Sequence, residues 1–178
     1  MKNLLILLCI FISIFNANKV LSQPKVGQQA PELKGFKMIT TNFPDLKNKF
    51  VFLDFWATWN TAEVRSLDHI NELAKRFKNK IVFLAVSDES EEQVRGFIQN
   101  NKWYNLFFGL DNEQILHKNF TVTDIPVYFL ISPENIILST GVSNEIKDSE
   151  FDSLVFRNDS IKLVKPIILQ KKAIRRKK

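Results

Sequence analysis

The feature that most constrains this chain is a near-continuous apolar run at residues 50–56, followed directly by a helical pattern. The run, Phe-Val-Phe-Leu-Asp-Phe-Trp, is typical of a central strand covered on both faces, because a half-exposed strand alternates apolar and polar residues. Beyond it, between Thr61 and Phe77, apolar residues recur at the spacing of one helix face: Ala62, Leu67, Ile70, Leu73, Ala74 and Phe77. A buried strand that leads into an amphipathic helix predicts an α/β domain.

Strands and helices continue to alternate along the rest of the chain. In chain order we expect a buried strand at 81–86, a turn and cap at 87–90 with a helix through Ile98, a short strand at 106–110, a short helix at 112–120, a hairpin of strands 127–131 and 136–138, and a closing helix at 145–156. The predicted fold is α/β, with a central mixed β-sheet flanked by helices. Its early strands are expected to pair in parallel, because crossover helices connect them.

Three stretches resemble one protein family. The stretch at 52–59, Phe-Leu-Asp-Phe-Trp-Ala-Thr-Trp, is similar to the approach to the active site in the thioredoxin superfamily, above all its secreted TlpA/ResA-like branch of thiol-disulfide oxidoreductases and redoxins. The stretch at 45–49, Asp-Leu-Lys-Asn-Lys, resembles the family's lead into the central strand, and 122–131 resembles its segment around a cis-proline. The resemblance covers about residues 26–157 and implies a thioredoxin-like fold.

The resemblance also shows where this chain departs from the family. The family places Cys-x-x-Cys directly after the second Trp, whereas this chain has Asn60 and Glu63 at those positions. Disulfide exchange begins with attack by a thiolate, which neither a carboxamide nor a carboxylate can supply. The resemblance therefore implies a degenerate active site without dithiol activity, and it leaves open whether the chain is an enzyme at all.

Asn60 and Glu63 fit a structural pattern at a helix start. In a capping box, Asn60 accepts a hydrogen bond from the N–H of residue 63, and Glu63 reaches back to the N–H of residue 60. Such a cap stabilises a helix by about 0.5–2 kcal/mol. The alternative is a working acid or base at Glu63, supported by Asp54, which matches the family's buried carboxylate. Two nearby carboxylates can push their pKa values apart and divide the acid and base roles.

The predicted binding residues surround the same site: Trp56, Trp59, Asn60, Ile125 and Pro126. The resemblance implies that Pro126 is cis and faces position 60 across a groove for extended peptide backbone. The leading hypothesis is therefore a non-redox module of the cell envelope that binds a peptide or protein. Its alternatives are an enzyme of another class that uses Asp54 and Glu63, and a structural component of an envelope complex that contacts partners through residues 103–104 or the basic tail.

The first 22 residues resemble a signal peptide, with an apolar run at 4–15 and small residues suited to cleavage before Gln23. A periplasmic or secreted location is expected, and an uncleaved membrane anchor is the less favoured alternative. Cys9, the single cysteine of the chain, lies inside this segment. The mature protein would then contain no thiol.

The basic excess of the chain is concentrated near its ends. Of the 25 Lys and Arg residues, six lie in the last eight positions and two in the predicted signal, so residues 24–170 carry 17 basic and 19 acidic side chains. A near-neutral body predicts no nucleic-acid partner. We divide the chain into a signal peptide at 1–22, a thioredoxin-like domain at 23–157 and an extension at 158–178, whose basic tail either solvates the terminus or contacts an anionic membrane surface.

No metal and no cofactor are predicted. His69 and His117 are isolated in the sequence, without the paired spacing of zinc ligands. No Gly-rich phosphate loop or nucleotide motif is present in the sequence.

Overall fold

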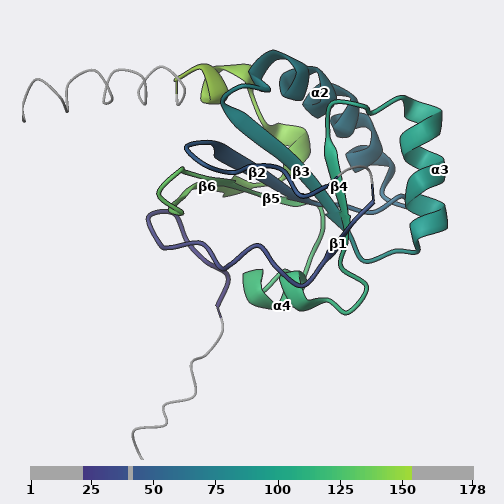
Figure 1. Ribbon diagram of the computed structural model, residues 1–178, viewed down its shortest axis with the longest axis horizontal. Coiled ribbons are helices and arrows are strands. Elements are labelled where there is room, and N and C mark those ends of the chain that lie inside the picture. The colour runs from purple at the N-terminus through teal and green to yellow at the C-terminus, as the bar shows by residue number, and fades with distance from the viewer. Residues whose placement is uncertain (1–21, 40–41, 154–178) are drawn as a thin grey trace, which may run out of the picture.

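The computed structural model describes residues 22–39 and 42–153, which build a mixed six-stranded sheet with helices on both faces (Figure 1). The strands are β1 (Lys37–Met38), β2 (Phe50–Phe55), β3 (Ile81–Ser87), β4 (Phe107–Leu110), β5 (Val127–Ile131) and β6 (Ile137–Gly141). The helices are α2 (Thr61–Phe77), α3 (Glu91–Asn101), α4 (Ile115–Phe120) and the 3₁₀ helix η1 (Ser143–Glu145). The predicted signal peptide up to residue 21 and the basic tail lie outside the described residues.

The strand order places β2 at the centre of the sheet. The order is β1-β4-β3-β2-β5-β6, in which β2, β3 and β4 are parallel and β5 runs antiparallel to β2. Because β2 has a neighbour on each side and helices above and below, all six of its residues are buried. The predicted central strand and the parallel pairing of the early strands are confirmed.

Side-chain alternation along β2 divides the core into two clusters. Phe50 and Phe52 belong to the cluster under α2 and α3, whereas Val51, Leu53 and Phe55 belong to the cluster with α4 on the opposite face. Figure 1 shows α2 and α3 on one side of the sheet and α4 on the other. Because side chains alternate with a period of two, Asp54 lies on the same face as Phe52 and therefore points toward α2.

The two long helices begin where their capping residues predict. Asn60 caps α2, and Ser90 caps α3 by accepting a hydrogen bond from the N–H of Gln93. Helix α3 ends at Asn101, and the following residue, Lys102, has a left-handed backbone (φ 59°) that lets its N–H donate to the carbonyl of Ile98. Local signals therefore fix these helix starts.

Two predicted boundaries are wrong. Helix α4 begins at Ile115 rather than 112, because the carboxylate of Asp111 accepts the N–H groups of Ile115 and His117, each at 2.8 Å. Gln114, the residue directly before the helix, has a left-handed backbone (φ 55°), so the helix cannot extend from Ile115 toward residue 112. Strand β6 extends to Gly141 rather than 138, because it pairs with β5 along its length.

The closing helix expected at 145–156 begins later than predicted. The 3₁₀ helix η1 ends at Glu145, Ile146 is extended (φ −70°, ψ 139°), and helical conformation resumes at 148–153. Phe151, in this last segment, is fully buried. Residues 154–156 lie outside the described part of the chain.

Candidate functional site

The loop between β2 and α2 carries two tryptophans in opposite environments. Trp56 is fully buried, and its ring packs edge-on against Trp103 and Phe108. Trp59, three residues later, has 68% of its surface exposed. The structure therefore places Trp56 in the core, where it cannot touch a ligand, and Trp59 on the surface.

Asn60 joins the start of α2 to the segment before β5. Its Oδ1 accepts the N–H of Glu63 at 3.3 Å, and its Nδ2 donates to the carbonyl of Ile125 at 3.4 Å, at the long end for a hydrogen bond. The Ile125–Pro126 peptide bond is cis, as the resemblance implied. Trp59, Asn60, Ile125 and Pro126 thus lie together, and we call these four residues the rim surface.

Glu63 does not complete the capping box. The N–H of Asn60 donates to the carbonyl of Ala57 at 3.2 Å, and among the described residues neither carboxylate oxygen of Glu63 has a hydrogen-bond partner. Glu63 belongs to the row of α2 that includes Leu67 and Ile70 and packs on the sheet. The side chain is therefore carried under the helix and fully buried, and the prediction that it reaches back to residue 60 is wrong.

Asp54 meets Glu63 beneath the start of α2. Asp54 is 1% exposed, and Ser143 donates a hydrogen bond to its Oδ1, while no donor reaches its Oδ2 among the described residues. Burial raises the pKa of Asp54 to about 6, and the proximity of the Glu63 carboxyl group and the hydrogen bond from Ser143 oppose this rise. Burial, and then the charge of the neighbouring Asp54 carboxylate, raise the pKa of Glu63 to about 10.

One proton on Glu63 explains this arrangement. Two ionised carboxylates offer only acceptors, so Asp54 Oδ2 and both Glu63 oxygens would lack donors in a buried place. A proton held by Glu63 supplies a donor between the two side chains and removes one buried charge. At neutral pH the two buried carboxyl groups therefore hold one proton between them.

The remaining residues singled out in the sequence lie apart from the rim surface. Trp103 is buried with its Nε1 donating to Asp68 at 2.7 Å, whereas the neighbouring Tyr104 is 72% exposed. Nε2 of His69 lies 3.0 Å from Asp148 on the surface. His117 is buried, with Nδ1 2.7 Å from the Asp111 carboxylate.

One residue at the site has no sequence signal that identifies it. Glu89, in the turn after β3, accepts hydrogen bonds from the backbone N–H and the hydroxyl of Thr58, at 2.6 and 2.7 Å. The sequence predicts only a turn and a helix cap at 87–90. A contact between residues 31 positions apart depends on the parallel pairing of β2 with β3, which brings the ends of the two strands together.

The mixed sheet, the strand–loop–helix unit at 50–77 and the cis-proline beside the helix start define a thioredoxin-like protein. A sequence model described as thioredoxin-like matches residues 48–137, half of the chain. The chain belongs to this family, and the predicted family and fold are confirmed.

Known relatives agree with this assignment. The chain is 29% identical to thiol-disulfide oxidoreductase ResA of Bacillus cereus over 133 residues, which cover 70% of this chain and 73% of the relative. It is also 29% identical to ResA of Bacillus subtilis over 168 residues, covering 85% and 89%. ResA-type thiol-disulfide oxidoreductases are therefore homologues of this protein.

Solved structures show the same fold. The thioredoxin domain of a thiol-disulfide oxidoreductase from Bacteroides vulgatus superposes with a TM-score of 0.61 at 22% identity, covering 75% of this chain and 96% of that one. StoA from Bacillus subtilis gives a TM-score of 0.52 at 21% identity, covering 65% and 90%. At these identities the likeness concerns the fold alone.

Proposed function

We propose that this protein is an extracytoplasmic thioredoxin-like domain that binds an extended peptide or partner strand at the rim surface without thiol chemistry. Asn60 and Glu63 stand where the family's cysteines are expected, and the single cysteine, Cys9, lies in the predicted signal peptide. Without a thiolate no mixed disulfide forms, so binding depends on non-covalent contacts. Among the described residues no helix has the length and apolar character needed to cross a membrane.

The observation that carries the proposal is the exposure of Trp59 beside a polar backbone acceptor. A 68% exposed Trp offers a large rigid apolar face, and such residues dominate the affinity of many interfaces. The carbonyl of Ile125 uses one lone pair for Asn60, so its second lone pair is available to an N–H of a bound strand. Apolar contact and backbone hydrogen bonding are thus offered side by side.

The carboxylate-enzyme alternative receives less support. The fold does bring Asp54 and Glu63 together, as that hypothesis requires. Both are buried, with exposed fractions of 1% and 0%, so neither reaches a substrate at the surface. The pair is better suited to a role inside the domain.

Replacing Trp59 with alanine tests the rim surface. We expect affinity for extended peptides to fall about 10- to 100-fold, the loss of an aromatic interface anchor. The measurement is titration of the full chain with an unstructured peptide library, followed by NMR chemical shifts of residues 59–60 and 125–127. Tyr104→Ala removes another exposed aromatic side chain away from these residues and should leave the affinity unchanged.

Photo-crosslinking in cells extends the same test. A photoreactive amino acid at position 59 should capture a discrete product that the same probe at Lys75, exposed on α2, does not capture. Equal background from both positions, together with equal peptide affinity of the wild type and Trp59→Ala, would rule out binding at the rim surface.

A further inference from the structure

The turn between β3 and α3 is hydrogen-bonded to the loop after β2, which carries Trp59 and Asn60 of the rim surface. Oε2 of Glu89 accepts the backbone N–H of Thr58 at 2.6 Å, and Oε1 accepts the Thr58 hydroxyl at 2.7 Å. Oε2 also accepts the hydroxyl of Ser87 at 3.1 Å. Thr58 directly precedes Trp59 and is 8% exposed, whereas Glu89 is partly exposed, so these bonds are partly buried.

Glu89 joins the middle of the loop to the sheet. On either side of Thr58, the N–H of Trp56 donates to Val86 and the N–H of Asn60 donates to Ala57. The first of these bonds continues the sheet, and the second closes a turn within the loop. The Thr58 N–H is fixed from outside the loop, by the Glu89 side chain.

The turn that carries Glu89 is itself held in place by hydrogen bonds. The backbone N–H of Glu89 donates to the Ser87 hydroxyl at 3.2 Å, and the Glu89 carbonyl accepts Nδ2 of Asn112 at 2.8 Å. Nε2 of Gln114 donates to the carboxylate of the neighbouring Asp88 at 2.9 Å. The segment before α4 therefore orders this turn, and an ordered acceptor orders its donors without a large loss of side-chain entropy.

We propose that Glu89 is the positioning residue of the rim surface, which fixes the loop so that Trp59 and Asn60 present one rigid face to an extended strand. This inference rests on the proposed function for its consequence in binding. The fixed loop itself is a property of the free protein.

The hydrogen bonds explain why an acceptor is needed at this position. Both groups of Thr58 that meet Glu89 donate to it, and the carboxylate has two acceptor oxygens for them. Glutamine would not remove the contact, because its oxygen can accept the Thr58 N–H and its NH₂ group can donate to the Thr58 hydroxyl oxygen. Methionine has a similar length and no oxygen acceptor, so Glu89→Met removes both hydrogen bonds at nearly the same volume.

Amide exchange in the ligand-free chain tests the positioning directly. In Glu89→Met we expect the Thr58 amide to exchange about tenfold faster, as after loss of a hydrogen bond to a charged group. The Trp59 indole should also become more mobile in ¹⁵N relaxation, while the amides of β2 and β3 keep their protection. Thr58→Val, which removes the hydroxyl alone, provides a second variant with a smaller effect of the same kind.

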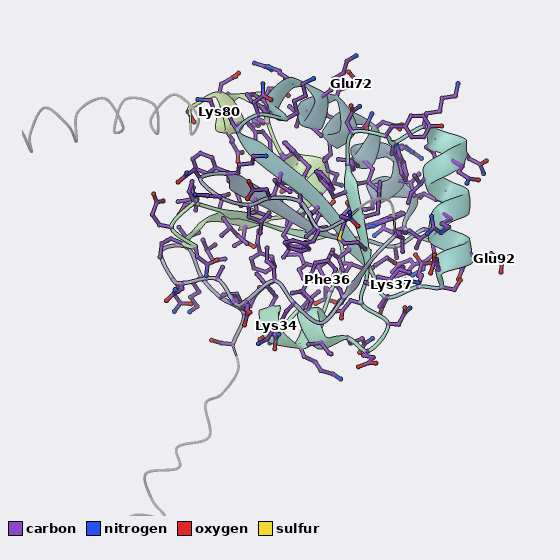
Figure 2. All side chains as sticks on the ribbon, viewed as in Figure 1. Lys34, Phe36, Lys37, Glu72, Lys80 and Glu92 are labelled. Atoms are coloured by element: carbon purple, nitrogen blue, oxygen red, sulfur yellow. The ribbon has the colours of Figure 1, made fainter. Side chains whose placement is uncertain are left out.

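Glu92→Met is the matched control, because Glu92 is exposed on α3, two positions beyond the Ser90 cap (Figure 2). Unchanged Thr58 exchange and Trp59 mobility in Glu89→Met would overturn the proposal. So would a loosened loop with unchanged peptide affinity, where about a tenfold loss is expected. If the wild type binds no peptide, the proposed function fails, whereas the exchange measurement still decides whether Glu89 fixes the loop.

Discussion

Replacing Glu63 with glutamine is expected to stabilise the protein at alkaline pH, by about 1–3 kcal/mol at pH 8. Glu63 is fully buried beside Asp54, and its pKa is raised from 4.5 to about 10. Near pH 8 the unfolded chain carries an ionised Glu63, so folding must take up a proton. Glutamine has no proton to take up, and its NH₂ group can still donate to Asp54.

The pH dependence gives this prediction its sign. A carboxyl group with a raised pKa in the folded state contributes stability that is fully present below its unfolded value and is lost as the pH rises through the folded value. For Glu63 the loss extends from about pH 4.5 to about pH 10. Asp54, raised from 3.8 to about 6, contributes a loss of the same sign over that lower window.

Urea denaturation at several pH values measures the effect. The free energy of unfolding of Glu63→Gln should be close to that of the wild type near pH 4 and exceed it increasingly toward pH 9. Glu72→Gln serves as the control, since Figure 2 shows Glu72 on the outer side of α2, and its effect should stay within about 0.5 kcal/mol. Parallel pH curves for Glu63→Gln and the wild type would contradict the shared proton.

Truncating Phe151 to alanine is expected to destabilise the protein by about 3–5 kcal/mol. Its ring is fully buried, with centroids 5.6 Å from Phe52, 5.9 Å from Phe77 and 5.7 Å from Phe83. Deleting it removes apolar surface from the core and leaves a cavity that rings from β2, β3 and α2 cannot fill without moving.

The same denaturation measurement tests this value. Phe43→Ala, at a 46% exposed phenylalanine, should cost about 1 kcal/mol or less. A loss below about 1 kcal/mol for Phe151→Ala would show that residues 148–153 do not dock on the sheet in solution. The expected large loss places these residues within the domain rather than in a terminal extension.

Local patterns predicted much of the fold. The apolar run of β2, the amphipathic spacing of α2 and the N-cap at Asn60 depend on neighbours within a few residues, so their positions follow from the chain alone. Boundaries failed where a distant or unusual backbone contact intervened. At α4 the Asp111 carboxylate and the left-handed Gln114 delay the helix, and at Ile146 an extended residue divides the closing segment.

At the candidate site, too, some features could be predicted from the sequence and others could not. The resemblance placed Asn60 beside a cis-proline, and the structure brings Asn60 and Ile125 into contact. It also left Glu63 with two readings, as a capping residue or as a partner of Asp54. Spacing within a helix cannot choose between them, because position 63 satisfies both the cap and the buried row of α2.

The sequence by itself determined the family, the order of strands and helices from residue 50 onward, and the absence of a thiol outside the predicted signal peptide, because these depend on residue identity and short-range periodicity. Only the tertiary structure decided that Glu63 turns inward to lie beside Asp54, that Trp59 rather than Trp56 is exposed, and that Glu89 holds Thr58. Each of these depends on which face of an element is buried and on which strands become neighbours. Burial and long-range pairing are properties of the packed sheet, and no short stretch of the chain specifies them.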